Sequence, residues 1–552
     1  MSRFLVACGL LVLVGCRVPA EPTGPAAVLA AGKSEVSLLF VGDTSVARGI
    51  GTVIDDANDP ARPFARMRET LDAHDLVFAN LECVLSDSSS EEANKTYRIR
   101  APEKNGSALH DVGIDVVSVA NNHAMDFGLQ GLTHTLAALE KEGVVAVGAQ
   151  RERGWAQPVT IMQVGVFSVG FLAYNAHGDE YEHESYRPTA ARYDIDDVID
   201  DIRRARPRVD FLVVSVHGGV ELSHELAPWQ ERDAKAAIDA GADLWIGHHP
   251  HVVQPWTVYR GKVIAWSLGD FVFDKEPQWL IARNSPRFFL QLNLRKDAEG
   301  KIVADPTLLG GAQDGSTWQP MLAPGSFDVD SFEQRSPPPT LRDLLPAARV
   351  ERVRGDIVTL CDRWETRRIP LGVHAFRWLA PRFACADADA EKLRPWETVA
   401  KSAELFEGAL KYGIWAHPNS NGVLRLRFTN VELGSRLEGF AGFPDWQIAL
   451  RDKARKRHKD EPSAATVRVL VAQERGAGLK LSTWIHGPSI ADVPQVVGGL
   501  DGVTTVPCKP GTTPLRLDTS DLQGTRHDVV VEISGGSGDV EGRFLFDLAV
   551  VP

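Results

Sequence analysis

Three histidines fall within four residues where positions 247–251 read Gly-His-His-Pro-His. The apolar run Leu244-Trp245-Ile246 comes directly before them, which predicts a buried strand that delivers the histidines at its carboxyl end. Pro250 restricts the backbone between His249 and His251, so both rings could bind one or two cations with little loss of conformational entropy. The alternative is a histidine-rich surface turn, which a lone His-x-His pair would favour.

Further polar groups follow other apolar runs, and an α/β sheet would gather all of them at one edge. Strands are expected at residues 36–41, 76–79, 114–119 and 210–216. Helices are expected at residues 64–74, 128–142, 194–205 and 228–240. The polar residues at the strand ends are Asp43, Glu82, Asn122, His123, His217, His249 and His251. Carboxylates and imidazoles bind hard or borderline divalent cations, and two close cations let one carboxylate bridge them while a hydroxide attacks phosphorus.

The chain has 552 residues, which is more than one hydrophobic core usually supports, so two or more domains are expected. Alternating strands and helices predict an α/β domain over residues 36–306, closed by an antiparallel edge strand at 287–294. Pro- and Gly-rich stretches predict a linker over 307–400, with a helical segment at 340–365. Alternating β-type runs between glycine-rich turns predict an all-β sandwich domain over 401–552.

Residues 1–16 predict an export signal, because Arg3 precedes an apolar run that is too short to span a bilayer. The run ends at Leu13-Val14-Gly15-Cys16, which resembles the lipobox of bacterial lipoproteins, where the cysteine is acylated. Residues 17–35 would then be a tether. Arg17 in place of an aspartate favours the outer membrane or cell surface of a Gram-negative bacterium. The alternative is a signal removed without lipidation, which gives a secreted protein.

The net charge of −13 argues against a general nucleic-acid-binding surface, because such a chain repels backbone phosphates on average. We therefore expect no nucleic-acid partner. An anionic substrate would need a local cation. No Cys-x-x-Cys pair occurs, so a cysteine zinc site is not predicted.

Six motifs between residues 36 and 274 together resemble the CapA family, which is associated with poly-γ-glutamate capsule synthesis and whose fold is similar to that of the calcineurin-like metallophosphoesterases. The motifs are Gly42-Asp43 with Arg48, Asn80-Leu81-Glu82, Ala120 to Gly128 with Asn122-His123-x-x-Asp126, His217-Gly218-Gly219-x-Glu221, Gly241-Ala242-Asp243 with residues 247–254, and Ser267 to Phe271. The resemblance implies a four-layer metallophosphoesterase-like α/β sandwich ahead of the all-β domain.

The resemblance also implies roles for individual residues at a site with two divalent metal ions, of Mn, Fe or Zn. The implied metal ligands are Asp43, Glu82, Asn122, His217, His249 and His251. Glu82 would bridge the ions. His123 would be the catalytic histidine that protonates a leaving oxygen or stabilises charge, with Arg48 beside it. His248 and Glu221 would contact substrate.

Three positions depart from the family pattern. Gly218 stands where the family has tryptophan, Leu222 where it has tyrosine, and Asp270 where it has asparagine. The first two are expected to reshape the substrate pocket. They therefore argue against polyglutamate as the substrate more than they argue against bound metal.

Two sets of residues have competing interpretations. Three carboxylates would either cap helices and loops or support ligands from behind: Asp126, Asp243 and Asp270. Three histidines are expected to be exposed loop residues: His177, His183 and His224.

The sequence predicts metal-dependent hydrolysis or transfer at the cell envelope during surface-polymer biogenesis. The substrate would be an anionic polymer or a phosphoester, and polymer synthesis or export machinery would be a partner. Two alternatives stay open, namely a non-catalytic envelope scaffold that binds an anionic polymer and a general phosphodiesterase acting on nucleotides or lipid headgroups. The scaffold is disfavoured because it has no physical need for His123 together with six ligands.

Overall fold

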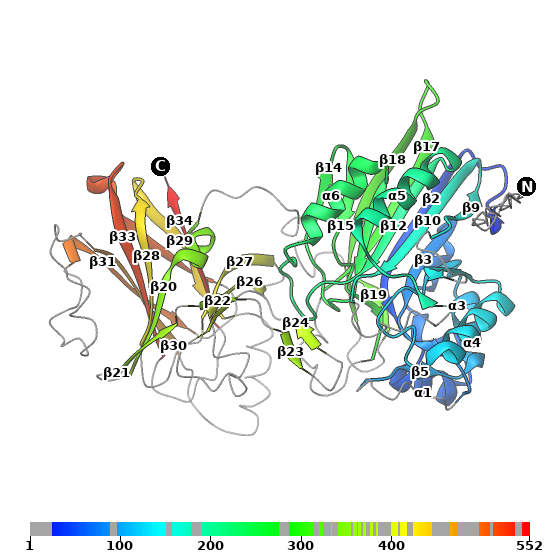
Figure 1. The fold of residues 1–552 in the computed structure, drawn as a ribbon, viewed down its shortest axis with the longest axis horizontal. Helices are drawn as coiled ribbons and strands as arrows, with labels where there is room; N and C mark the ends of the chain where they lie inside the picture. Colours follow the sequence, from blue (N-terminus) through cyan, green and yellow to red (C-terminus); the bar gives the residue numbers. More distant parts are fainter. Residues whose placement is uncertain are drawn as a thin grey trace, which may run out of the picture.

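The computed structural model divides the chain into an α/β region and an all-β region (Figure 1). Among the residues that it describes, no helix has the length and apolar character needed to cross a membrane. The described residues are 25–88, 97–150, 157–177, 189–274, 286–313, 319–323, 333, 340–354, 357–361, 363–365, 368–370, 376–378, 382–384, 399–406, 409–416, 423–443, 464–472, 496–507, 512–535 and 544–551.

The first sheet of the α/β region has the order β19-β18-β17-β2-β3-β6-β7, and β16 pairs with the end of β2. Strands β2, β3, β6 and β7 are parallel, whereas β17, β18 and β19 are antiparallel. The strand bounds are β2 (Glu35–Thr44), β3 (Leu76–Leu81), β6 (Val116–Ser118), β7 (Val145–Val147), β16 (Asp270–Val272), β17 (Arg287–Lys296), β18 (Ile302–Gln313) and β19 (Pro320–Leu322). The helices beside it are α1 (Arg48–Ala57), α2 (Arg68–Asp72), α3 (Ser107–Asp111) and α4 (Gly128–Lys141).

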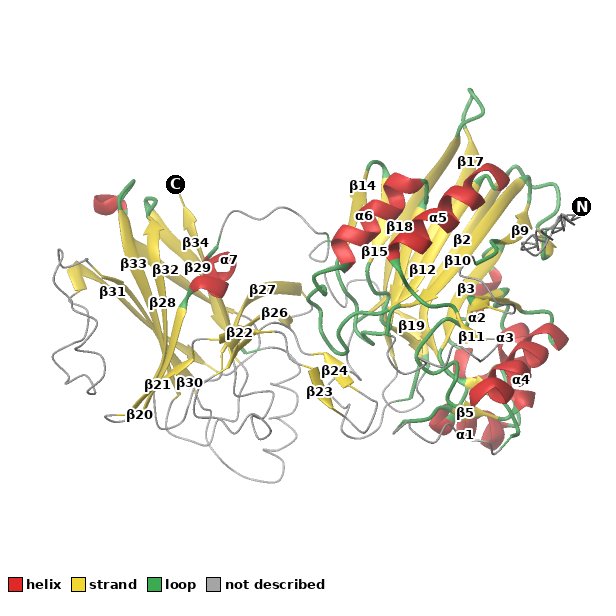
Figure 2. Ribbon diagram, viewed as in Figure 1, coloured by secondary structure: helices red, strands yellow, loops and turns green. Residues whose placement is uncertain are grey.

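The second sheet has the order β1-β9-β10-β12-β13-β15-β14. Its bounds are β1 (Ala27–Leu29), β9 (Thr160–Val164), β10 (Phe167–Asn175), β12 (Phe211–His217), β13 (Leu244–His248), β14 (Trp256–Tyr259) and β15 (Lys262–Ala265). Helices α5 (Ile195–Ala205) and α6 (Gln230–Ala240) lie across it (Figure 2). Small ladders join β4 (Val84–Leu85) to β5 (Arg100–Ala101) and β8 (Ala149–Gln150) to β11 (Thr189–Ala190).

Apolar side chains hold the two sheets face to face between two layers of helices. Buried residues of both sheets share one cluster, in which the Phe78 ring of β3 stacks on the Phe171 ring of β10 at 5.6 Å. A second cluster joins the outer face of the first sheet to α1 and α4, and a third joins the second sheet to α5 and α6. Burial of each large apolar side chain contributes roughly 1.5–3 kcal/mol, so this packing fixes the strand ends that carry the polar residues.

Three helices of this region, α4, α5 and α6, follow the sequence expectation, whereas α1 was not predicted and the helix expected at residues 64–74 is shortened to α2. Helix α4 buries Leu132, Leu136 and Leu139 at the spacing of one helix face. Helix α5 begins after Asp194, whose carboxylate accepts a hydrogen bond from the Asp196 backbone N–H at 2.9 Å. Between α4 and α5, β9 and β10 pair antiparallel as a hairpin across residues 165 and 166.

The predicted end of the α/β domain at residue 306 is wrong. Residue 306 lies in the middle of β18, which pairs with β17 along residues 302–311 and then with β19. Strand β17 is therefore an inner strand between β2 and β18, not the expected edge. The predicted tether over residues 17–35 is also too long, because β1 pairs with β9 at residues 27–29.

The all-β region consists of two sheets with the orders β21-β20-β28-β33-β30-β31 and β22-β25-β26-β27-β34-β29-β32, whose buried side chains form one cluster. The bounds of the first sheet are β20 (Arg349–Arg354), β21 (Ile357–Cys361), β28 (Val423–Glu432), β30 (Ala464–Ala472), β31 (Val496–Pro507) and β33 (Arg526–Gly535). Those of the second are β22 (Arg363–Glu365), β25 (Arg382–Ala384), β26 (Val399–Phe406), β27 (Ala409–Ala416), β29 (Arg436–Gly442), β32 (Thr512–Asp518) and β34 (Phe544–Val551). A separate ladder joins β23 (Arg368–Pro370) to β24 (Phe376–Trp378).

The helical segment predicted at residues 340–365 is mostly strand. Only α7 (Leu341–Leu344) and a short 3-10 turn are helical there, and β20, β21 and β22 follow. Strand β20 pairs with β28, so the all-β region begins near residue 349 and not at residue 401. Positions 350 and 353 of that segment are valines of this strand, in agreement with the preference of β-branched residues for strands.

The two regions meet at an ion pair near the histidine segment. The Arg342 guanidinium donates to both carboxylate oxygens of Glu225, at 2.5 and 2.8 Å, and lies over the ring of Tyr412. Gln254 Nε2 donates to the Glu225 backbone oxygen at 3.0 Å. Through Arg342 and Glu225, α7 and the Tyr412 ring of β27 are therefore connected to Gln254, three residues after His251.

The extended strand β18 gives a first testable prediction. A chain that ends at residue 323 should fold and bind metal, whereas one that ends at residue 306 should be destabilised, because five residues of β17 lose their β18 partners. Each lost backbone hydrogen bond costs about 1 kcal/mol. Thermal unfolding followed by circular dichroism compares the two chains, and equal midpoints would contradict the prediction.

Candidate metal centre

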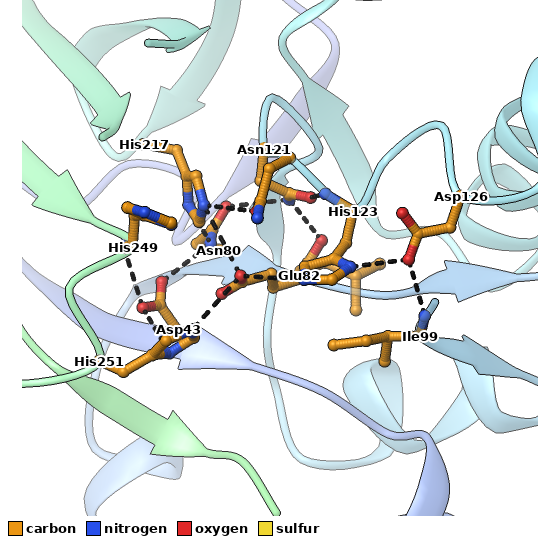
Figure 3. Close-up of polar contacts among 12 residues, drawn as sticks. Asp43, Asn80, Glu82, Ile99, Asn121, His123, Asp126, His217, His249 and His251 are labelled. Atoms are coloured by element: carbon orange, nitrogen blue, oxygen red, sulfur yellow. Dashed lines mark hydrogen bonds and ion pairs between the residues drawn. The ribbon is translucent and has the colours of Figure 1, made fainter. Parts of the chain in front are cut away.

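Neighbouring strands of both sheets end at the site and deliver its polar side chains (Figure 3). Asp43 lies near the end of β2, and Glu82 directly follows β3. His217 is the last residue of β12, and β13 leads into His249 and His251. The register pairs Asp43 with Asn80 and His217 with residue 248, so residues far apart in the sequence meet at one edge.

The first group of potential ligands is Glu82, His217 and His249, which each offer an atom within 4.8 Å of the others. His217 Nε2 lies 3.6 Å from Glu82 Oε1 and 2.9 Å from Asn122 Oδ1. The rings of His217 and His249 are 4.8 Å apart between centroids. Asn122 is therefore placed to add a fourth ligand to this group.

The second group is Asp43, His251 and Asp270, with the same spacing limit of 4.8 Å. His251 Nδ1 lies 2.8 Å from Asp270 Oδ1 and 3.4 Å from Asp43 Oδ2. His251 Nε2 lies 3.6 Å from Glu82 Oε1. Glu82 thus stands between the two groups, where a bridging carboxylate is expected.

Glu82 provides the strongest sign that a cation belongs here. Its side chain is fully buried, and neither carboxylate oxygen has a hydrogen-bond partner among the residues that the structure describes. Burial raises the pKa of this carboxyl well above its ordinary value. A buried carboxylate without donors is unfavourable unless a cation compensates it, so the donor set fits a metal ion.

The imidazoles have different protonation preferences. Burial, followed by the neighbouring histidines, lowers the pKa of His217 well below its ordinary value, which favours the neutral ring that binds metals. Burial also lowers the pKa of His251, but the carboxylates of Glu82, Asp270 and Asp43 outweigh it and raise the pKa to about 10. A cation bound by His251 would therefore replace a proton.

Two asparagines, Asn80 and Asn121, contact ligand residues or their backbone, although they were assigned no role beyond membership of the motifs. Asn80 Nδ2 donates to Asp43 Oδ1 at 2.9 Å and lies 3.2 Å from His217 Nδ1. Asn121 Nδ2 donates to the Leu81 backbone oxygen at 2.8 Å. Both amides are fully buried, and this position beside ligand residues is typical of groups that orient a metal site.

His123 lies at the edge of the centre and is oriented by a carboxylate. Its Nδ1 donates to Asp126 Oδ2 at 2.7 Å, and its Nε2 lies 3.9 Å from Glu82 Oε1. Asp126 also accepts a hydrogen bond from the Ile99 backbone N–H at 2.7 Å. Asp126 thus supports His123 from behind and directs its Nε2 toward the potential ligands.

Asp243, the second carboxylate with two interpretations, has a structural role. It accepts hydrogen bonds from Arg206, from the Leu212 backbone N–H at 2.9 Å, and from Lys262 Nζ at 2.6 Å. These partners fix the start of β13.

The residues expected to contact substrate differ in how deeply they are buried. The His248 ring is fully buried, with Nδ1 3.3 Å from Asp43 Oδ1, so it lies against a ligand residue, and its contact with substrate stays a prediction. The Arg48 side chain is partly exposed and donates to Asp274 Oδ1 at 3.1 Å. Glu221 is half-buried, and its charge contributes to the raised pKa of Glu82.

The expectation for the exposed histidines is wrong at two positions. The His177 ring lies 4.3 Å from the His249 ring between centroids. His224 is buried, with Nδ1 2.5 Å from the Val253 backbone oxygen. His183 lies outside the described residues. His177 comes two residues after β10, so the rule of polar groups at strand ends could have found it.

The absence of a side chain at Gly218 leaves room for Ala176 and Trp229 to pack against the backbone there. A Cβ atom there would lie 2.7 Å from the Ala176 Cβ and 3.2 Å from the ring of Trp229. The tryptophan of the family pattern does not fit at this position. The space beside His217 is instead filled by Trp229 from another part of the chain.

Comparison with known proteins places this region in a family. Residues 37–275 match the model of the bacterial capsule synthesis protein PGA_cap. The PGA biosynthesis protein CapA of Bacillus subtilis is 31% identical over 274 residues, which are 49% of this chain and 71% of that protein. The capsule biosynthesis protein CapA of Bacillus anthracis is 30% identical over 292 residues, or 51% and 69% of the two chains.

Among solved structures, the 5'-nucleotidase of Candida albicans aligns with 52% of this chain and 53% of its own, at 10% identity and a TM-score of 0.30. This likeness is too weak to add to the assignment. The alignments to the two CapA proteins cover more than two thirds of each of them, and residues 37–275, which match the family model, contain both ligand groups. The chain therefore belongs to the bacterial capsule synthesis protein family, PGA_cap.

Proposed function

We propose that the chain is a metal-dependent hydrolase or transferase of the phosphoesterase type that acts in the formation of a capsule or similar surface polymer. The observation that supports this most is the buried Glu82 carboxylate, whose oxygens have no hydrogen-bond donor in the described part of the chain and lie between two groups of ligand residues. The relatives named as capsule and PGA biosynthesis proteins supply the biological setting.

Bound divalent ions would polarise a phosphoryl oxygen and supply a hydroxide at neutral pH. The protein's own residues would position the ions and donate a proton. Glu82 would hold the two positions together, while Asn80 and Asn121 keep the surrounding side chains in place. His123 would hold the proton at Nε2 for the leaving oxygen, because Asp126 fixes its Nδ1 as the other donor.

The proposed substrate class is an anionic polymer or phosphoester. The chain carries a net charge of −13 and repels anions on average, so an anionic substrate would depend on local positive charge. The cations of the site would supply it, together with Arg48, which is paired with Asp274. The absent tryptophan at position 218 favours a substrate that differs in shape from that of relatives with the full motif.

One experiment separates this enzyme from a non-catalytic scaffold. The full chain, loaded with Mn²⁺, is assayed with bis-p-nitrophenyl phosphate and p-nitrophenyl phosphate, before and after treatment with a chelator. We expect metal-dependent release of p-nitrophenol that chelation abolishes and added metal restores. A chain that binds metal and poly-γ-glutamate without hydrolysing either ester would favour the scaffold.

We also propose that the chain is exported and attached to the membrane through a lipid on Cys16, which lies outside the described residues. Replacing Cys16 with serine should move the protein from the membrane fraction to the soluble fraction, because a thioether-linked lipid needs the sulfur. Cell fractionation followed by immunoblotting measures the change. If the C16S protein still sediments with membranes after a high-salt wash, the anchor proposal is wrong.

A further inference from the structure

Asp270 occupies a position beside Asp43 that the sequence left with two interpretations. It begins β16, and its register partner on β2 is Asp43. Its side chain is buried, and Oδ1 accepts a hydrogen bond from His251 Nδ1 at 2.8 Å. Two carboxylates therefore converge on one nitrogen of His251.

A buried arginine places a positive charge beside the Asp270 carboxyl. Arg287 is 1% exposed, and its Nη2 lies 3.9 Å from Asp270 Oδ2. Arg287 Nη2 also donates to Gln313 Oε1, a neutral group. A guanidinium keeps its charge in proteins, and a buried charge needs a nearby countercharge. Asparagine at position 270 would remove this countercharge from Arg287.

The two ligand groups consequently differ in chemistry. The group around Glu82 contains two imidazoles and one carboxylate, with the Asn122 amide oxygen beside it. The group around His251 contains two carboxylates and one imidazole. Imidazole-rich sites suit borderline ions such as Zn²⁺, whereas oxygen-rich sites suit harder ions such as Mn²⁺.

We propose that Asp270 is a metal ligand and that it makes the two cation positions unequal, with a harder ion held by Asp43, His251 and Asp270. This inference rests on the proposed metal centre. It adds the identity of one metal ligand and the preference of one cation position for a harder metal ion. An asparagine at position 270 would keep an oxygen that accepts the hydrogen bond from His251 Nδ1 but would lose the negative charge. The two roles of Asp270, as a ligand and as a hydrogen-bond acceptor only, can therefore be separated.

The test is calorimetric titration of the full, metal-stripped chain with Mn²⁺, first alone and then with one equivalent of Zn²⁺ already bound. For the wild type we expect one position that prefers Zn²⁺ and one that takes Mn²⁺. In Asp270→Asn, Mn²⁺ affinity should fall by at least about 10- to 100-fold, because the position loses the charge of one carboxylate ligand, whereas an acceptor-only role would leave the affinity unchanged. Zn²⁺ affinity should stay unchanged.

A second variant guards against misfolding around Arg287. The double variant Asp270→Asn with Arg287→Met removes both charges, and it should fold by circular dichroism and show the same selective loss of Mn²⁺. Unchanged Mn²⁺ affinity in both variants would overturn the ligand role, as would an equal loss of both ions. If the wild type retains two ions and hydrolyses the test esters in that case, the proposed function stands and only this inference fails.

Discussion

Replacing His123 with alanine is expected to lower ester hydrolysis by about two to four orders of magnitude, the usual contribution of a positioned proton donor. The metal content should not change, because His123 belongs to neither ligand group. Its Nε2 is 3.9 Å from Glu82 Oε1, close enough to act on a substrate at the site. Steady-state kinetics and elemental analysis of the same preparation measure both effects.

Two further variants sharpen this prediction. His134→Ala is a matched control, because His134 forms a partly exposed pair with Glu103 at 2.9 Å and neither residue belongs to a ligand group. It should leave kcat unchanged. Asp126→Asn should lower kcat and alter its pH profile, since His123 loses the carboxylate at its Nδ1. Loss of metal from His123→Ala would show instead that His123 is a ligand.

Replacing Glu82 with alanine is expected to abolish hydrolysis and to remove the stabilisation of the fold by metal. Glu82 Oε1 lies 3.6 Å from both His217 Nε2 and His251 Nε2, so its loss opens both positions. A ligand at a hundred times its dissociation constant stabilises a fold by about 2.7 kcal/mol. Thermal unfolding with and without Mn²⁺ should therefore show a metal-dependent shift in the wild type and none in the variant.

The Glu103→Gln variant is the control for the loss of a glutamate, because Glu103 is partly exposed. It should keep the full metal-dependent shift. A Glu82→Ala protein that keeps the shift would contradict a bridging role, because the cations would then be held without that carboxylate.

Most of the metal centre could be predicted because its ligands obey a local rule. The strands that carry the ligands are mostly runs of apolar residues, and the ligands lie at or soon after their ends, as His217 ends β12 and Glu82 follows β3. Packing of the sheets then brings the strand ends together without any further information in the sequence.

The rest depended on pairings that no local pattern encodes. Asp270 lies beside Asp43 only because β16 joins β2 across more than two hundred residues. Strand β18 contains Pro306 and two glycines that resemble a linker, yet it is a strand because β17 supplies its hydrogen bonds. The burial of His248 likewise reflects its place at the end of β13, where its ring packs near Phe78 and Asp43.

The most direct test of the metal centre is the metal content of the purified full chain. The protein is incubated with Mn²⁺ and Zn²⁺, passed through gel filtration and measured by elemental analysis, with His251→Ala and His134→Ala treated in parallel. The two ligand groups predict about two ions per chain in the wild type and in His134→Ala, and fewer in His251→Ala. A wild-type chain without bound metal, or equal metal in all three proteins, would contradict the account.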